Sequence, residues 1–178
     1  MTTKQELRKI AKQIRKTLDI ESISKNIQKS LLSLPEYCDV KNIFTYHSFV
    51  DEISTLGFFK DKGKNWFVPK IHNDNLLACE YCSHALTKNK FGIKEPTTPI
   101  IETNSKIDMI ILPALMADKK GNRLGYGRGF YDRFLNSLSH SPLKILLIPE
   151  ELLQEKIPCE EHDCTVDLII TQCNIYRL

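Results

Sequence analysis

Four of the seven glycines of this chain lie between Gly121 and Gly129, shortly after the run Ile107-Asp-Met-Ile-Ile-Leu112, which is apolar apart from Asp108. The apolar run has the length and composition of a parallel strand that is covered on both faces. Backbone N–H groups in a glycine-rich loop can approach a polyanion closely. The run from Ala117 to Arg133 that contains these glycines carries the cations Lys119, Lys120, Arg123 and Arg128. Because ligands collect at the carboxyl ends of strands in open α/β sheets, the sequence predicts a phosphate-binding loop at that edge of a parallel sheet.

The spacing of the loop, Gly125-x-Gly127-x-Gly129, differs from the two commonest phosphate motifs. A Walker A loop needs Lys followed by Ser or Thr after its last glycine, and a dinucleotide fingerprint needs a glycine where Phe130 stands. Asp132 follows the loop at the expected start of a helix, where it can hold the magnesium that accompanies a nucleotide. A flexible connection is the alternative interpretation, and the interleaved cations and Asp132 argue against it.

The charge of the chain argues against bulk electrostatic binding to polyanionic surfaces. Its 25 basic and 22 acidic side chains leave a net charge of +3, too small for a protein that coats nucleic acid or an anionic membrane. The N-terminal residues carry charges where a signal peptide needs an apolar stretch, and the longest apolar run, around 107–117, is too short to span a bilayer. We expect a cytoplasmic monomer with small-molecule partners, and no nucleic-acid or membrane partner.

The six cysteines raise the alternative of a metal or redox site, because cytoplasmic thiols stay reduced. Cys79 and Cys82, together with Cys159, His162 and Cys164, would supply enough ligands for a structural zinc site. Cys79 and Cys82 fall in an expected strand, however, where residues three apart point to opposite faces and can hardly share one metal. A thioredoxin-like pair would need a helix start after a strand, which this context lacks. A zinc site is therefore the less favoured interpretation.

The N-terminal half alternates helices and strands. Residues 3–18 have an apolar stripe of helical spacing and begin with a capping-box pattern, Thr3-x-x-Glu6, and a second helix is expected over 22–32. Residues 42–48 predict a strand, 51–62 a helix and 66–69 a short strand, which together would form a β-α-β unit. We expect a turn at 72–75, a strand at 76–82 and an irregular loop at 88–99.

The C-terminal half continues this alternation. After the strand at 107–112 and the glycine loop, we expect a helix over 130–138, a strand over 144–148, a short helix over 150–154 and a strand over 165–171. No internal repeat or change in composition marks a second domain. The order predicts one domain over residues 1–178, an α/β fold built as a three-layer α/β/α sandwich with a mostly parallel central sheet.

The segment from Pro113 to Arg133 resembles the signature of the 5-formyltetrahydrofolate cyclo-ligase family, whose members are also called methenyltetrahydrofolate synthetases. It reads Pro-Ala-Leu-Met-Ala-Asp-x-x-Gly-x-Arg-Leu-Gly-Tyr-Gly-x-Gly-Phe-Tyr-Asp-Arg. The resemblance runs nearly end to end. Its other parts are Lys4-x-x-x-Arg8, Asp51-Glu-Ile-Ser-Thr55, Pro69, Gly92-Ile-x-Glu-Pro96, Pro158-x-Glu-x-His-Asp163 and the final Ile-Ile-Thr171. It implies a fold of the NagB/RpiA/CoA transferase-like type.

The resemblance implies an ATP-dependent ring closure of 5-formyltetrahydrofolate to 5,10-methenyltetrahydrofolate, with ADP and phosphate as the other products. In the family mechanism the formyl oxygen attacks the γ-phosphate, N10 adds to the activated carbon, and phosphate leaves. Such a reaction depends on positioning and charge neutralisation and needs no covalent nucleophile on the enzyme. ATP is then the co-substrate, and Mg²⁺ is the expected cofactor.

The resemblance also implies roles for residues at matching positions. The implied ATP-binding residues are Lys4, Arg8, Arg123, Leu124, Gly125, Tyr126, Gly127, Arg128, Gly129, Phe130 and Tyr131, of which Arg123, Arg128 and Tyr131 are implied as catalytic. The implied folate-binding residues are His47, Glu52, Phe91, Tyr126 and Phe130, and the implied magnesium ligands are Asp132 and Asp163. Structural alternatives stay open for Asp132 as a helix cap, Asp163 as a turn residue and Glu52 as a first-turn residue favoured by the helix dipole.

The chain departs from the family pattern at three positions. Met116 stands where an aromatic is usual and Leu152 where Gln is usual, which bears on packing near the nucleotide, and Phe130 replaces the commoner tyrosine. Two other function classes stay open: a regulatory module that binds a nucleotide without turnover, and a metal-stapled interaction protein. An isomerase or a CoA transferase can share the architecture, because fold does not fix function, but neither explains a phosphate loop paired with magnesium carboxylates.

Overall fold

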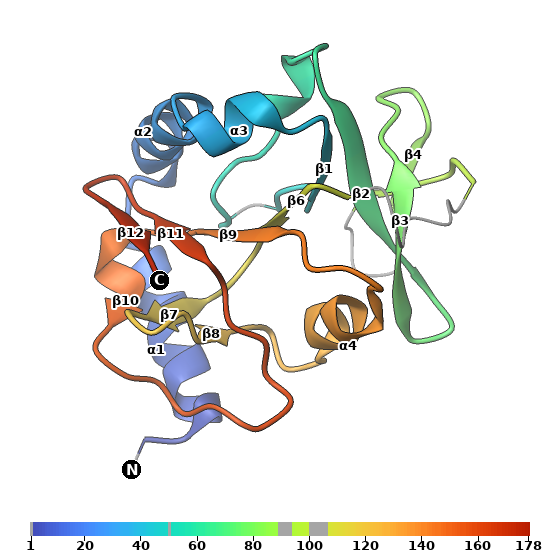
Figure 1. The fold of residues 1–178 in the computed structure, drawn as a ribbon. Helices are drawn as coiled ribbons and strands as arrows, with labels where there is room; N and C mark the ends of the chain where they lie inside the picture. Colours follow the sequence, from blue (N-terminus) through green and yellow to red (C-terminus); the bar gives the residue numbers. More distant parts are fainter. Residues whose placement is uncertain (1, 50, 89–93, 100–106) are drawn as a thin grey trace.

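The computed structural model describes residues 2–49, 51–88, 94–99 and 107–178. Its largest element is a seven-stranded sheet in the order β12-β11-β9-β6-β1-β2-β3 (Figure 1). In chain order these strands are β1 (Asn42–Thr45), β2 (Asn65–His72), β3 (Asn75–Glu80), β6 (Met109–Leu112), β9 (Leu143–Leu147), β11 (Leu168–Ile170) and β12 (Ile175–Arg177). The five central strands run parallel, and the two edge strands, β12 and β3, are antiparallel to their neighbours. The prediction of an α/β fold with a mostly parallel central sheet is confirmed.

The sheet is buried on both faces, as its apolar runs predict. Along β6, Met109 and Ile111 belong to one apolar core, while Ile110 and Leu112 belong to the other. All four side chains are fully buried. Because successive strand residues point to opposite faces, one apolar strand supplies both cores.

Helices cover both faces of the sheet, so the molecule has three layers (Figure 1). One face packs against α1 (Lys4–Arg15) and α4 (Phe130–Ser137) through Ala11 and Phe134. The other face packs against α2 (Ile20–Leu32) and the short α3 (Pro35–Asp39). The helices predicted over 3–18, 22–32 and 130–138 are present with shifted ends, and α3 is an additional one. The predicted capping box of α1 is confirmed.

The helix predicted over 51–62 is wrong. This segment forms turns and one 3₁₀ helix, η1 (Phe58–Lys60). It bonds instead to the chain that follows β1, because the Thr55 hydroxyl donates to the Tyr46 carbonyl at 2.7 Å and the Tyr46 hydroxyl donates to the Ile53 carbonyl at 2.8 Å. Side-chain hydroxyls thus supply backbone carbonyls with hydrogen bonds that a helix would otherwise have to supply. The strands β1 and β2 are parallel, as predicted, but the described residues between them form no α-helix.

Two small sheets accompany the central one. In the first, β7 (Met116–Asp118) pairs with β8 (Arg123–Leu124) and β10 (Leu153–Gln154), and in the second, β4 (Leu86–Lys88) pairs with β5 (Lys94–Pro96). The helix predicted over 150–154 is instead a 3₁₀ helix, η2 (Glu150–Leu152), followed by β10. Strands of two or three residues are too short to show a period in the sequence, so none of these was predicted.

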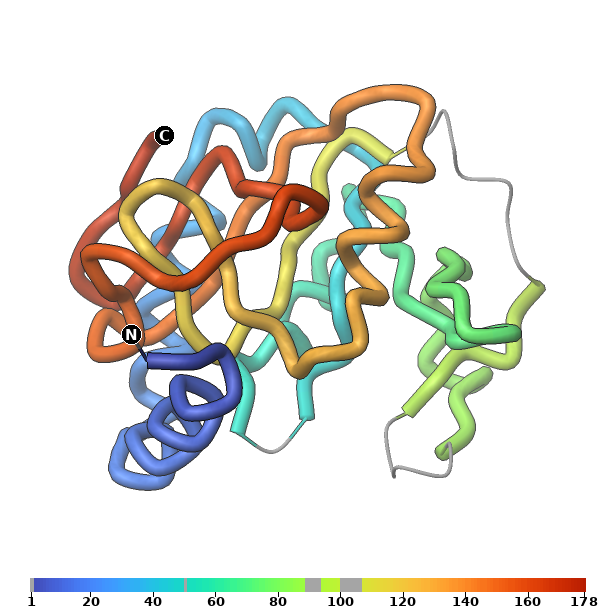
Figure 2. The backbone as a smooth tube through the Cα atoms, turned by 90° about the horizontal axis from the view of Figure 1, so that it is seen from below, coloured from blue at the N-terminus to red at the C-terminus, as the bar shows by residue number. Residues whose placement is uncertain are grey.

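Three segments far apart in the sequence meet on one side of the molecule (Figure 2). They are the start of α1, the glycine loop and the segment that precedes β11, joined by hydrogen bonds of Arg8 to Gly125 and of Lys4 to Asp163. Within the described residues, no helix combines the length and the apolar composition needed to cross a membrane.

Candidate functional site

A cavity of about 810 Å³ opens at the carboxyl ends of two neighbouring central strands. Tyr46 and His47 follow β1, Pro113 follows β6, and all three line the cavity. The start of α1 and the glycine loop form further wall, and residues 160–163 close one side. A cavity of this size accommodates a small organic ligand. It lies at the edge of the sheet where the sequence predicts the phosphate-binding loop.

The cavity brings together the residues that the sequence analysis selected. Those in the described part of the chain all line it: Lys4, Arg8, His47, Glu52, Arg123, Leu124, Gly125, Tyr126, Gly127, Arg128, Gly129, Phe130, Tyr131, Asp132 and Asp163. The remaining one, Phe91, lies outside the described residues. A place on the wall does not assign a role, so the individual roles stay predictions.

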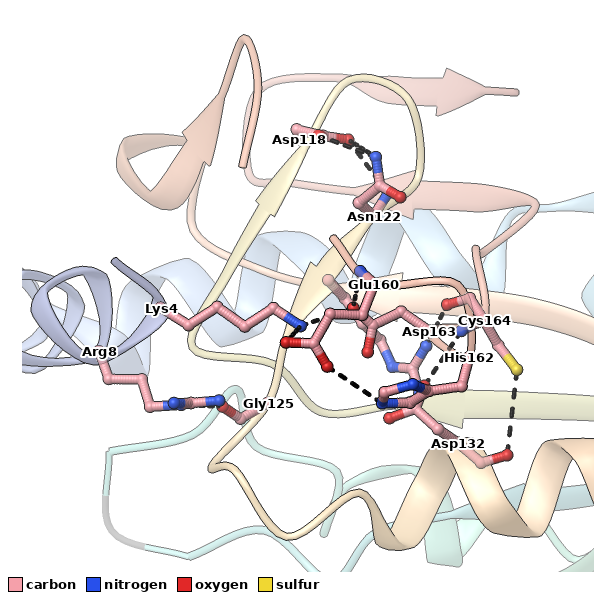
Figure 3. Close-up of polar contacts among 11 residues, drawn as sticks. Lys4, Arg8, Asp118, Asn122, Gly125, Asp132, Glu160, His162, Asp163 and Cys164 are labelled. Atoms are coloured by element: carbon pink, nitrogen blue, oxygen red, sulfur yellow. Dashed lines mark hydrogen bonds and ion pairs between the residues drawn. The ribbon is translucent and has the colours of Figure 1, made fainter. Parts of the chain in front are cut away.

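Two of the four cations attributed to the phosphate loop lie elsewhere. Lys119 and Lys120 belong to the β7–β8 turn and do not line the cavity, and the Lys119 ammonium pairs with Glu155. The turn is organised by Asp118, a fully buried carboxylate that accepts a hydrogen bond from Lys120 N–H at 3.0 Å. It also accepts one from Asn122 N–H at 3.0 Å (Figure 3). The prediction that Lys119 and Lys120 serve the phosphate loop is therefore wrong.

The glycine loop takes a conformation that its glycines permit. Gly127 has φ +100° and Gly129 has φ +64°, in the left-handed region that side chains disfavour. Gly129 is also the N-cap residue of α4. A Cβ atom at Gly127 would lie 3.2 Å from the guanidinium carbon of Arg8. The Arg8 Nε–H donates to the Gly125 carbonyl at 2.9 Å, so α1 lies directly against the loop (Figure 3).

Lys4 reaches from the first turn of α1 to two carboxylates. Its Nζ lies 2.7 Å from Asp163 Oδ2 and 3.2 Å from Glu160 Oε1 (Figure 3). Burial by itself would lower the pKa of Lys4, but the two carboxylates outweigh it, and the pKa lies above its ordinary value. Burial would likewise raise the pKa of Asp163, but the hydrogen bonds from Lys4 and from Glu160 N–H, together with the charge of Lys4, outweigh burial and lower the pKa. Lys4 is therefore a charged group held at the cavity wall.

Arg123 and Asp132 form a second and more buried ion pair. Only 4% of the Arg123 side chain is exposed, and its Nη2 lies 2.7 Å from Asp132 Oδ1. The guanidinium also donates to the Cys164 carbonyl, and Cys164 N–H donates to Asp132 Oδ1 at 3.1 Å. These bonds tie β8, α4 and the segment before β11 together. Asp132 thus has a structural role in addition to its predicted role as a magnesium ligand.

Asp132 and Asp163 fit the oxygen chemistry of a hard cation in part. From the described residues, hydrogen bonds reach only Oδ1 of Asp132 and only Oδ2 of Asp163, so one oxygen of each carboxylate faces no such donor. Mg²⁺ commonly keeps several waters and takes one or two protein carboxylates. Glu160 and His162 lie beside Asp163, with ligand atoms of the three residues within 4.8 Å of one another. Sequence reasoning did not select Glu160, whose signal was its place in the motif before Asp163.

The alternative zinc site is not formed. Among the residues that the structure describes, the group of potential ligands found close together is Glu160, His162 and Asp163, and it contains no cysteine. All six cysteines are free, and Cys79 is buried. Burial, followed by the nearby Asp132 charge, raises the pKa of Cys164, so this thiol is also a poor metal ligand.

Glu52 lies on the opposite wall, in the turn that replaces the predicted helix. Its Oε2 accepts from Phe49 N–H at 2.9 Å, and its Oε1 accepts from the Tyr126 hydroxyl at 3.0 Å. Burial raises the pKa of Glu52, and these two hydrogen bonds offset only part of the rise. Its proposed first-turn position in a helix is wrong, because no helix forms there. The carboxylate instead joins the segment after β1 to the glycine loop.

His47 forms a flat, mostly uncharged part of the wall. Its ring stacks on Phe59, with centroids 6.1 Å apart and an interplanar angle of 24°. Burial, together with the charge of Lys94, lowers the pKa of His47, which favours the neutral ring at physiological pH. Lys94 itself lines the cavity and was not selected from the sequence.

The sequence analysis missed a buried arginine that joins α1 to two segments next to the cavity. Arg15, at the end of α1, donates to the carbonyls of Asp51 and Ala114, which lie in the segments after β1 and β6. An arginine on an amphipathic helix is ordinarily expected in solvent, so the helical pattern offered no signal for this burial.

The fold and the cavity define the class: an α/β protein with a ligand site at the carboxyl edge of a parallel sheet, lined by a glycine loop, cations and carboxylates. The model of the 5-formyltetrahydrofolate cyclo-ligase family matches residues 1–172, and the chain belongs to this family of ligases.

Individual relatives agree with the family match. The 5-formyltetrahydrofolate cyclo-ligase of Haemophilus influenzae is 32% identical over 168 residues, covering 89% of each chain. A probable 5-formyltetrahydrofolate cyclo-ligase of Schizosaccharomyces pombe is 29% identical over 180 residues, covering 89% of this chain and 88% of the relative. Among solved structures, the 5,10-methenyltetrahydrofolate synthetase of Aquifex aeolicus superposes with a TM-score of 0.87 at 28% identity, covering 99% of this chain and 93% of that one.

Proposed function

We propose that this protein catalyses the ATP-dependent cyclisation of 5-formyltetrahydrofolate to 5,10-methenyltetrahydrofolate, with release of ADP and phosphate. Membership of the family supports the reaction. The observation that carries the proposal in this chain is one cavity that holds the glycine loop, the cations of α1 and the carboxylate of Glu52 together. A phosphate donor and a folate could meet there in one site.

The triphosphate of ATP binds along the glycine loop. Gly127 and Gly129 leave backbone close to the cavity without side chains, while Lys4, Arg8 and Arg128 line the same wall. Loop N–H groups and cations of this kind neutralise phosphate charge and hold the γ-phosphate in line with its acceptor. Arg123 contributes its positive charge to this wall while its guanidinium stays buried against Asp132 and Cys164.

The reaction proceeds in two steps. The formyl oxygen attacks the γ-phosphorus, a new P–O bond forms, and the bond from the γ-phosphorus to the bridging oxygen of ADP breaks. N10 then adds to the activated formyl carbon and loses its proton to solvent, the carbon–oxygen bond breaks, and inorganic phosphate leaves the methenyl bridge behind. The enzyme supplies position and charge stabilisation in both steps.

Tyr131 serves as a hydrogen-bond donor in this scheme. Burial, followed by the charge of Glu52, raises the pKa of Tyr131, so its hydroxyl stays protonated at neutral pH. A neutral phenol can donate to an oxygen that gains negative charge, but it cannot act as a general base there. On the folate side, Glu52 accepts from N–H groups of the pterin ring, with His47, Tyr126 and Phe130 around it.

We also propose Mg²⁺ as the cofactor, held through Asp132 and Asp163, where it would supply charge neutralisation for the phosphates of ATP. The open carboxylate oxygens of these two residues support this assignment. A single domain over residues 1–178, a monomeric state, a cytoplasmic location, the absence of nucleic-acid partners and the acceptance of polyglutamylated folate stay predictions.

The reaction is tested by near-ultraviolet absorbance. Purified protein is incubated with 5-formyltetrahydrofolate, with ATP and Mg²⁺ added separately and together. We expect the methenyl chromophore to grow only when both are present, with one ADP formed per chromophore. Binding of ATP and folate without chromophore would contradict the proposal and favour a regulatory module that lacks turnover.

A further inference from the structure

Phe49 is a large apolar side chain that the fold leaves exposed on the cavity wall. It is 48% exposed and lines the cavity in the segment after β1. Tyr126, 52% exposed, lines the same cavity from the glycine loop. Burying a phenylalanine side chain ordinarily stabilises a protein, so an exposed one on the wall of a binding cavity indicates contact with a ligand.

The carboxylate of Glu52 joins the two aromatic residues. Phe49 N–H donates to Glu52 Oε2, and the Tyr126 hydroxyl donates to Glu52 Oε1. A carboxylate has about four acceptor sites, so each Glu52 oxygen retains capacity for a further N–H donor. All three residues line the same cavity, so its wall offers two aromatic side chains and a carboxylate.

Hydrogen bonds anchor the backbone of Phe49 and of described residues near it in the chain. Glu52 N–H donates to the Phe49 carbonyl at 2.8 Å. The Arg15 guanidinium donates to the carbonyl of Asp51, and the Thr55 hydroxyl donates to the Tyr46 carbonyl. A ring contact made by a residue whose backbone is anchored in this way requires little ordering when the ligand binds.

We propose that Phe49 is a folate-binding residue, which packs against the face of the pterin ring while the N–H groups of that ring donate to Glu52. The inference rests on the proposed function and adds a residue to the folate side of the site. The chemistry that this site recognises is a flat heterocycle with neighbouring N–H donors. The adenine of ATP is a poorer match, because its ring presents acceptors at most of its edge and its phosphates must reach the glycine loop.

The test compares binding by Phe49→Ala, Phe49→Tyr and wild type, measured calorimetrically for 5-formyltetrahydrofolate alone and for a non-hydrolysable ATP analogue with Mg²⁺. Loss of the ring contact should weaken folate binding at least about tenfold in Phe49→Ala. Phe49→Tyr should bind folate within about threefold of wild type, because it retains the ring. Affinity for the ATP analogue should be unchanged in both variants.

Leu56→Ala is the matched control. Leu56 is 47% exposed, lies in the same stretch of chain after β1 and does not line the cavity, so this variant should bind both ligands as wild type does. Equal folate affinity in Phe49→Ala and wild type would overturn the inference and leave the proposed function intact. Weakened binding of the ATP analogue alone would assign Phe49 to the nucleotide and overturn it as well. A wild-type protein that binds no folate would overturn both proposals.

Discussion

At the scale of single residues, Lys4 competes with any cation for Asp163. The Lys4 ammonium lies 2.7 Å from the carboxylate that we propose as a magnesium ligand and 3.2 Å from Glu160. Lys4→Met removes this competitor, so the protein without nucleotide should bind Mn²⁺ roughly threefold to tenfold more tightly, while its KM for ATP rises. Manganese binding is measured by electron paramagnetic resonance. Lys119→Met breaks a similar pair outside the cavity, with Glu155, and should change neither quantity. Unchanged manganese affinity in Lys4→Met would remove Asp163 from the cation site.

Arg123 has a structural role, as the partner of Asp132, and a proposed role in the use of ATP, and one substitution removes both. Arg123→Ala leaves Asp132 without its partner in a partly buried place, which should cost about 3 kcal/mol in the free energy of unfolding. Surviving folded protein should use ATP less well while its folate affinity changes little. Urea unfolding measures the first effect and steady-state kinetics the second. Arg177→Ala breaks an exposed pair with Glu36 and should cost less than about 1 kcal/mol. Comparable losses in the two variants would refute the structural part of this assignment.

Glu52 should give folate binding a dependence on pH. The ionised carboxylate is the form that accepts N–H donors on all its sites, and burial raises its pKa above the ordinary value for Glu. Folate affinity is therefore full above this raised pKa and is lost as the pH falls through it, at a higher pH than for an exposed glutamate. Calorimetric titrations with 5-formyltetrahydrofolate across the mildly acidic range measure the effect. Glu52→Gln should bind more weakly and show a flatter profile, and an unaltered profile in this variant would exclude Glu52 as the cause.

At the scale of elements, the glycine loop offers a matched pair of positions. Gly127 has φ +100°, and an added Cβ would approach the Arg8 guanidinium to 3.2 Å, whereas a Cβ at Gly125 would meet nothing within 4 Å. Gly127→Ala should therefore cost about 1–2 kcal/mol of stability and raise the KM for ATP, because it strains the loop and displaces Arg8. Gly125→Ala should fold as wild type does. Thermal unfolding and ATP kinetics of the two variants provide the comparison, and equal behaviour would show that the loop tolerates a side chain at Gly127.

The success of sequence-based prediction also differed between kinds of element. The strands at 107–112 and 144–148 were found because apolar runs of strand length report burial on both faces. The helix predicted over 51–62 failed because Thr55 bonds to the chain after β1, a tertiary contact that no local pattern reveals. Glu52 lies in the same non-helical segment, where it occupies a turn at the cavity wall. The sequence thus selected the right carboxylate for the cavity wall and assigned it the wrong local structure.

At the scale of the whole molecule, the alternation of strands and helices was enough to predict the three layers, because each parallel strand needs cover on both faces. The cavity could be predicted as a set of residues only through the resemblance, since Lys4, Glu52 and Asp163 come from distant segments with no shared local pattern. Arg15 and Lys94 were missed for the same reason. Their places depend on how α1 and β5 pack, and a single sequence records that packing only where a motif marks it.

The sequence analysis also missed the C-terminal strand β12, which forms one edge of the central sheet. The family match ends at residue 172, whereas β12 lies beyond it, pairs antiparallel with β11 and is followed by Leu178, whose N–H donates to the Asp167 carbonyl at 3.1 Å. Removing residues 174–178 exposes the edge of the buried strand β11, so the shortened protein should melt at a lower temperature and aggregate. Because none of the removed residues lines the cavity, its soluble fraction should still bind ATP and folate. Calorimetry measures the melting temperature, and light scattering measures the aggregation. A chain that lacks only Leu178 retains the β11–β12 pairing and should lose less stability; equal losses in the two shortened chains would assign the effect to the packing of Leu178 against Gly121.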